Sequence, residues 1–205
     1  EFQGDEAVIM QRAAQALAGD DRELFLHQKG PAEILIPMSL WTLTGSTVEW
    51  QMRAPFVLVG LLAVLVVTCL AARWFGAQEG AAAALGAGVA AGLLSAVNGF
   101  LVAFSRIVQY QNIVIAMGGL SLLWLLRYRR RSSPSALVLA AAFMAFGLLA
   151  HYDAILFAPA GLMIVAESVM PRRIGSPGGL AQHVTNGLCA ALVGAAILSL
   201  FYLPY

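Results

Sequence analysis

Long apolar runs dominate this sequence and determine the solvent in which the chain folds. Five of them are Ala54 to Phe75, Ala81 to Phe104, Ile113 to Leu126, Ala136 to Ala150 and Ala154 to Val169, and a sixth, Leu188 to Leu203, follows a polar interruption. A helix needs about 20 apolar residues to cross a bilayer core about 30 Å thick. The runs therefore predict an all-α, polytopic transmembrane helix bundle of five or six spans over residues 54–205.

Composition supports lipid as the main solvent and excludes one class of function. Apolar residues make up 60% of the chain and charged residues 11%, whereas soluble domains have about half and about a quarter. The formal net charge is +1, which is too small for the basic face that a nucleic-acid-binding protein needs. The cysteines and the three histidines lack the spacing of metal ligands. We therefore predict no metal from them and no cofactor, and a divalent metal from other ligands stays open.

The basic residues of the apolar region predict the orientation of the bundle. Those in the loops on one side are Arg73, Arg127, Arg129, Arg130, Arg131, Arg172 and Arg173. Residues 1–53, the surroundings of Arg106 and the turn at residues 151–153 fall on the other side. Because short cytoplasmic loops are enriched in arginine and lysine, we expect residues 1–53 to form a non-cytoplasmic loop. In a prokaryote the membrane would be the plasma (inner) membrane.

The polar N-terminal segment has helical patterns of its own. Ala7 to Leu17 reads as a helix, and Pro31 to Leu43 is amphipathic but too short to span, so we expect interfacial helices on the outer membrane surface. The small residues of Gly80 to Ala96 predict a helix that packs tightly inside the bundle. The chain begins at Glu1 without methionine and ends at Tyr205 just after an apolar run, so we expect a fragment of a longer protein.

Charged residues of the N-terminal segment are the first candidates for a site. Asp5 and Glu6 are adjacent. They are either acids that stabilise a helix N-terminus or catalytic carboxylates. His27, Lys29 and Arg53 follow in the same segment and are cations that could face a phosphate. The structural alternatives are a lysine that reaches lipid headgroups and an arginine that anchors the first span.

Two polar clusters interrupt the apolar runs on the same side. Arg106 is followed by Gln109, Tyr110, Gln111 and Asn112. Polar groups at this depth either line a protein cavity or satisfy an irregular turn.

The second cluster, His151-Tyr152-Asp153, forms a tight connection in which Asp153 either caps the next helix or faces the site. The sequence contains neither the GxxxxGK[ST] phosphate loop nor the GxSxG nucleophile motif.

The order of these motifs resembles the lipid-linked sugar glycosyltransferases of the GT-C superfamily, in the branch with the protein O-mannosyltransferases and the aminoarabinose transferase ArnT. The matching positions are Asp5-Glu6, Lys29-Gly30-Pro31 for a Lys-Pro-Pro turn, Gly45 followed by Glu49, Arg53-Ala54-Pro55 for Arg-Leu-Pro, and Ser105-Arg106. The family has an aspartate five residues after that arginine, where this chain has Gln111.

The resemblance implies transfer of a sugar from a polyprenyl-phosphate donor to an acceptor, of unknown identity, on the outer side of the membrane. It implies Asp5 as the base that deprotonates the acceptor, with Glu6 as its helper. Lys29, Arg53 and Arg106 would bind the donor phosphate. His27, Tyr110, Gln111, His151 and Asp153 are possible substrate contacts.

Two other functions stay open at this stage. A transporter would place ionisable residues in the middle of its spans, and these runs have almost none. A non-catalytic, transferase-like subunit of a membrane complex would explain why Gln111 replaces the family's aspartate.

Overall fold

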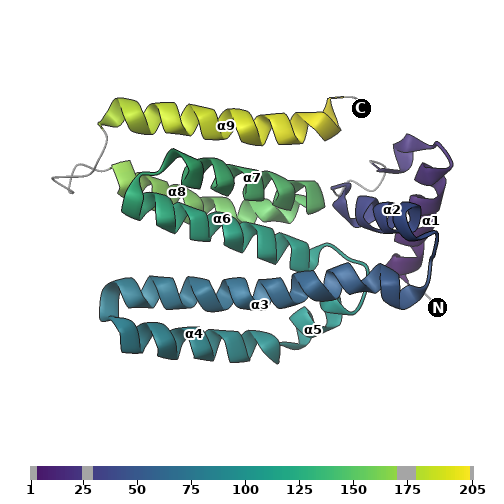
Figure 1. Ribbon diagram of the computed structural model, residues 1–205, viewed down its shortest axis with the longest axis horizontal. Helices are drawn as coiled ribbons and strands as arrows, with labels where there is room; N and C mark the ends of the chain where they lie inside the picture. Colours follow the sequence, from purple (N-terminus) through teal and green to yellow (C-terminus); the bar gives the residue numbers. More distant parts are fainter. Residues whose placement is uncertain (1–3, 25–29, 170–178, 204–205) are drawn as a thin grey trace.

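The chain folds into a bundle of helices with two short helices packed across one end (Figure 1). The computed structural model describes residues 4–24, 30–169 and 179–203, and these residues contain no strand. The bundle consists of α3 (Glu49–Glu79), α4 (Ala81–Ala96) with α5 (Gly99–Ser105), α6 (Gln111–Arg131), α7 (Pro134–Ala150), η2 (Tyr152–Phe157) with α8 (Ala158–Val169), and α9 (Leu180–Tyr202). The expected all-α bundle is confirmed.

The two expected N-terminal helices also form. They are α1 (Asp5–Leu17) and α2 (Ala32–Thr44), and a single 3-10 turn, η1 (Asp21–Leu24), follows α1. Both helices lie at the end of the bundle where α3 begins and α9 ends (Figure 1). We refer to this as the α1/α2 end.

Several described helices suit a membrane. By length and composition α3, the continuous stretch Tyr152–Val169 and α9 can cross a bilayer, and the bent pair of α4 and α5 would make a fourth span. The other two expected runs lie within α6, which ends in Arg129, Arg130 and Arg131, and α7, which has 17 residues. These two helices fall short in apolar length, although they lie alongside the others in the bundle (Figure 1). The chain is thus an integral membrane protein.

Two helix boundaries differ from the sequence prediction. The run from Ala81 to Phe104 is not one helix, because the chain bends by 59° between α4 and α5. The Asn98 side chain accepts a hydrogen bond from the Leu101 N–H at 3.1 Å and so begins a new helix. At the other end of the chain, α9 begins at Leu180 rather than Leu188, so His183, which precedes the predicted apolar run, lies within this helix.

The small residues of α4 pack closely against α3. A Cβ on Gly92 would lie 2.5 Å from Thr68 Oγ1, and a Cβ on Gly88 would lie 3.1 Å from the Ala72 Cβ. The prediction of tight packing is therefore confirmed. The prediction of an interior position is wrong for the described bundle, because α4 lies at its edge (Figure 1) and exposes Leu85 and Leu94.

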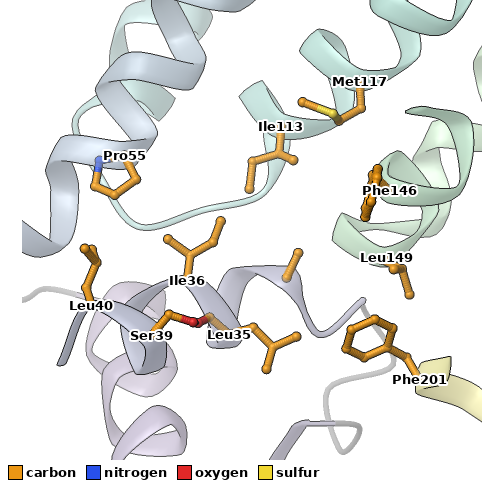
Figure 2. Close-up of a pocket in the computed structure, with 11 residues that line it drawn as sticks. Leu35, Ile36, Ser39, Leu40, Pro55, Ile113, Met117, Phe146, Leu149 and Phe201 are labelled. Carbon is orange, nitrogen blue, oxygen red and sulfur yellow. The ribbon is translucent and has the colours of Figure 1, made fainter. Parts of the chain in front are cut away.

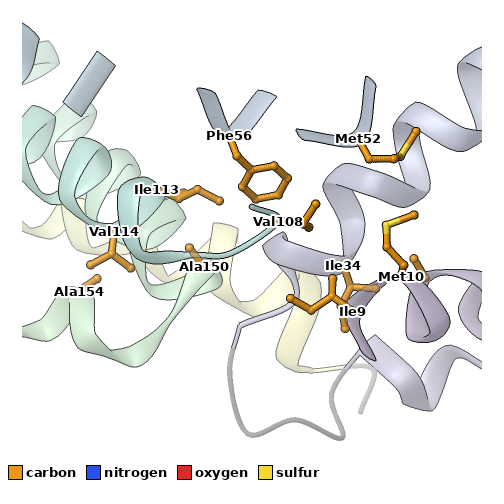
Figure 3. Close-up of a cluster of buried hydrophobic side chains, with 11 residues drawn as sticks. Ile9, Met10, Ile34, Met52, Phe56, Val108, Ile113, Val114, Ala150 and Ala154 are labelled. Atoms are coloured by element: carbon orange, nitrogen blue, oxygen red, sulfur yellow. The ribbon is translucent and has the colours of Figure 1, made fainter. Parts of the chain in front are cut away.

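A core of apolar side chains attaches α1 and α2 to the bundle. Ile9, Met10 and Ile34 face Met52 and Val108 in this cluster (Figure 3).

Gly30 lets the chain that leads into α2 pass close to the end of α7. A Cβ at this position would overlap the backbone oxygen of Leu149 at the end of α7. Glycine thus allows the two backbones to meet. The N-terminal helices are held at the α1/α2 end by side-chain packing and by this backbone contact.

Candidate active site

Polar side chains from α1, α3 and the loop before α6 meet at the α1/α2 end. Glu6 is buried and accepts two hydrogen bonds from Arg53, at 2.8 Å from Nε and 2.5 Å from Nη2. The Val108 N–H donates a third, at 3.0 Å to Oε1. A buried carboxylate needs such partners to remain charged. Glu6 therefore joins the first turn of α1 to α3 and to the loop at residues 106–110.

Arg53 is occupied by carboxylates. Besides Glu6, it pairs with Glu49 one turn earlier on α3. The sequence interpretation gave Arg53 to the donor phosphate, but in this structure its guanidinium contacts two acids. A phosphate at Arg53 would have to share it with them.

Arg106 has a different environment. Its side chain is exposed just after α5, and no carboxylate of the described residues forms an ion pair with it. Its charge is therefore available to an anion. His27 and Lys29 lie outside the described residues.

Asp5 is the exposed carboxylate of the pair. Gln109 Nε2 donates to Asp5 Oδ2 over 3.4 Å, and Gln111 Nε2 donates to Gln109 Oε1 over 2.9 Å. Gln111 is thus linked to Asp5 through Gln109. The first of these contacts is long, so it holds the Asp5 carboxylate only weakly.

Aromatic rings from two segments stack beside these acids. The centroids of the Tyr110 and His151 rings are 3.9 Å apart, and the ring planes are inclined by 8°. The Tyr152 ring also contacts His151, with the two ring centroids 4.0 Å apart. His151 is buried, whereas Tyr152 is exposed. The stack fixes the turn after α7 against the start of α6.

His151 and Asp153 form a pair whose character depends on protonation. His151 Nδ1 lies 3.1 Å from the Asp153 N–H and 3.0 Å from Asp153 Oδ2. A neutral ring accepts from the N–H at Nδ1, and a protonated ring donates to the carboxylate. The cap of η2 is His151, so Asp153 does not cap the helix that follows.

Tyr110 interacts with the charges of several acids at this end. Burial raises the pKa of its hydroxyl, and the negative charges of Asp153, Glu33 and Asp5 raise it further. The hydroxyl therefore keeps its proton at neutral pH.

Some of the polar residues here gave little signal in the sequence. Glu33 is buried on α2, and an acid within an apolar amphipathic stretch was the available clue. Asn112, by contrast, belongs to the polar cluster predicted after Arg106; it is buried, and its Nδ2 donates to the Leu101 oxygen at 3.1 Å. The Val108 N–H could not be found from residue types, because any residue has that group.

No metal site can be built from the described residues. They contain no group of three or more His, Cys, Asp or Glu side chains placed to hold a metal ion. That the histidines and cysteines bind no metal stays a prediction.

An apolar cavity lies next to the polar cluster. It has a volume of about 500 Å³ and is lined by side chains of α2, α3, α6 and α7 and by Phe201 of α9. Figure 2 shows Leu35, Ile36, Met117 and Phe146 around it. Its one polar side chain is Ser39, whose hydroxyl donates to the Leu35 oxygen of its own helix at 2.7 Å. The cavity suits a hydrocarbon ligand.

Comparison with known protein families gives one result. The family model of dolichyl-phosphate-mannose-protein mannosyltransferases matches residues 31–197. The match includes Arg53, Arg106 and residues 110–153, and it begins after Asp5 and Glu6. Comparisons with curated proteins and with solved structures found no match. Because the model covers most of the chain, this protein belongs to the dolichyl-phosphate-mannose-protein mannosyltransferase family.

Proposed function

We propose that this chain is part of a membrane glycosyltransferase that transfers a sugar from a polyprenyl-phosphate donor to an acceptor at the α1/α2 end. The observation that carries the proposal is the meeting of three features at that end. They are the exposed carboxylate of Asp5, the exposed guanidinium of Arg106 and the apolar cavity beside α2. A lipid-linked sugar has a hydrocarbon tail, an anionic phosphate and a reactive sugar carbon, and each feature suits one of these parts.

The cavity suits the isoprenoid tail. Its lining is apolar, and Ser39, the exception, already donates to its own helix. A hydrocarbon chain loses nothing on entering such a site, whereas a sugar would lose hydrogen bonds to water. Helices α2, α6 and α7 would thus hold the donor with its phosphate directed to the polar cluster.

Arg106 is the main described candidate for the donor phosphate. Negative charge builds on the leaving phosphate oxygen during transfer, and a fixed guanidinium stabilises it. Arg53 has a positioning role in this scheme, because it holds Glu6, which in turn holds the loop that begins at Arg106. Lys29 is kept as a second phosphate ligand on the family resemblance alone.

Asp5 is the proposed base. The acceptor hydroxyl loses its proton to the Asp5 carboxylate as its oxygen forms a bond to the anomeric carbon. The bond from that carbon to the phosphate oxygen breaks, and polyprenyl phosphate leaves with the electron pair. Glu6 helps by fixing the first turn of α1 through Arg53. His27, Tyr110, Gln111, His151 and Asp153 are proposed contacts for the sugar or the acceptor.

The α1/α2 end is proposed to face the non-cytoplasmic side. The basic residues Arg73, Arg127 and Arg131 lie within α3 and α6, toward the opposite end of these helices. Arg172 and Arg173, which the sequence placed on the same side, lie outside the described residues. The positive-inside rule assigns that opposite end to the cytoplasm.

A donor-exchange assay tests the function. The full-length protein in membranes would be given one radiolabelled sugar carried either on polyprenyl phosphate or on a nucleotide, and transfer to endogenous acceptors would be measured. We expect transfer from the lipid-linked donor alone. Arg106→Gln should lower its rate, and Arg22→Gln, which changes another exposed arginine of the same side, should not.

Two results would contradict the proposal. Equal transfer from the nucleotide sugar would exclude a lipid-linked donor. No transfer from any polyprenyl-phosphate sugar would favour the alternative, a non-catalytic subunit of a membrane complex.

A further inference from the structure

We propose that the end of the bundle opposite α1 and α2 holds a binding site for the headgroup of an anionic membrane phospholipid. The site is a cavity of about 160 Å³ between α3 and α6. It is lined by Arg73, Leu120, Leu123, Trp124 and Arg127. None of these residues takes part in the candidate active site, so the inference does not rest on the proposed transferase activity.

The depth of Arg73 suits a headgroup. No charged residue lies between Arg53 and Arg73 on α3. At the rise of an α-helix, twenty residues separate the two arginines by about 30 Å, which is about the thickness of the hydrocarbon core. If Arg53 marks one interface, Arg73 therefore reaches the phosphate layer of the other.

Arg73 and Arg127, which line the cavity, can bind an anion. Both side chains are exposed, and neither forms an ion pair with a carboxylate of the described residues. The nearby acid Glu167 pairs with Arg129 at 2.5 Å. The cavity thus presents two positive charges that form no ion pair with an acid of the described residues.

One contact within α6 and one between α3 and α6 hold the cavity in shape. The guanidinium of Arg127 lies over the Trp124 ring, 5.2 Å from its centroid. Arg130 Nη2 donates to the Arg73 backbone oxygen at 3.3 Å, which joins the ends of the two helices. The arginines therefore project from a fixed wall.

The walls indicate a lipid rather than a free anion. Two guanidinium groups suit the oxygens of a phosphate, and basic cavities between membrane helices bind anionic headgroups. Leu120 and Leu123 continue the cavity along α6, where an acyl chain can lie. Inorganic phosphate would contact the two arginines and would make no use of the apolar surface of Leu120 and Leu123.

Native mass spectrometry of the full-length protein in micelles tests the site. Phosphatidylglycerol would be titrated against the wild type, the double variant Arg73→Gln/Arg127→Gln, and the control Arg131→Gln, an exposed arginine at the same end that does not line the cavity. We expect the double variant to lose about 30-fold in affinity, from the contribution of each arginine near an anionic surface. The control should bind like the wild type.

Three results of the lipid titrations would overturn the proposal. They are unchanged binding in the double variant, an equal loss in Arg131→Gln, which would indicate diffuse charge attraction, and equal binding of phosphatidylcholine by the wild type. A parallel titration with inorganic phosphate separates the two sources of phosphate, because competition at equal concentration would show a free-anion site instead. Elution of the double variant at the wild-type volume in size-exclusion chromatography controls for folding.

Discussion

The pair formed by Glu6 and Arg53 allows a quantitative test of how the site is held together. The Glu6 side chain is 1% exposed and the Arg53 side chain 25%. Removing one partner of a buried pair costs about 3 to 5 kcal/mol, because it leaves an uncompensated charge. Since water reaches part of Arg53, we expect Arg53→Gln to lower the free energy of unfolding by about 3 kcal/mol, the lower end of that range.

Two further variants separate this buried pair from an exposed one. Glu49 pairs with the same arginine, but its side chain is 36% exposed and it lies one turn away on the same helix. Glu49→Gln should therefore cost less than about 1 kcal/mol. In the double variant Glu6→Gln/Arg53→Gln no buried charge is left unpaired. Its cost in free energy of unfolding should be smaller than the sum of the costs of Glu6→Gln and Arg53→Gln, each measured as a single variant.

Denaturation of the full-length protein in micelles, followed by tryptophan fluorescence, measures these differences at one detergent concentration and pH. We expect Arg53→Gln to lower the free energy of unfolding more than Glu49→Gln does, and the effects of the Glu6 and Arg53 changes to be coupled. An Arg53→Gln variant as stable as Glu49→Gln would refute it. Strict additivity of the Glu6 and Arg53 changes would also refute it.

Three other substitutions follow from the packing. Gly30→Ala should destabilise the fold by about 1 to 3 kcal/mol, as overpacking does, because the new Cβ overlaps the Leu149 backbone; the melting temperature in detergent measures this. Gly92→Val should also lower that temperature by separating α4 from α3, whereas Gly86→Ala, with open space around its Cβ, should leave it unchanged or raise it. Ser39→Trp should fill the apolar cavity and raise the KM for the polyprenyl donor without changing stability; an unchanged KM would remove the cavity from donor binding.

The helices were largely predictable from the sequence because lipid leaves few choices. An apolar run of sufficient length has to form a helix in a bilayer. The run from Ala81 to Phe104 was the exception, since a single side chain, Asn98, begins a new helix within apolar surroundings. The position of α4 was also missed. Small residues indicate close contact with one neighbour, and they do not show whether a second neighbour covers the other face.

The candidate site was harder to predict, because its geometry depends on contacts between distant segments. The acid pair of Asp5 and Glu6 was identified from adjacency and resemblance, but only the fold distinguishes a buried Glu6 from an exposed Asp5. The sequence placed Arg53 among phosphate ligands because it cannot show that Glu6, far away along the chain, reaches the same guanidinium. The hydrogen bond from the Val108 N–H has no signature in residue types at all.

The most direct test of the central claim compares Asp5→Asn with Asp21→Asn in the full-length protein. Both changes replace an exposed carboxylate by an amide of the same size in the same segment. Transfer of radiolabelled sugar from polyprenyl phosphate would be measured in membranes with matched protein levels. We expect Asp5→Asn to abolish transfer and Asp21→Asn to leave it intact. Undiminished transfer by Asp5→Asn would contradict the account and exclude this carboxylate as the base.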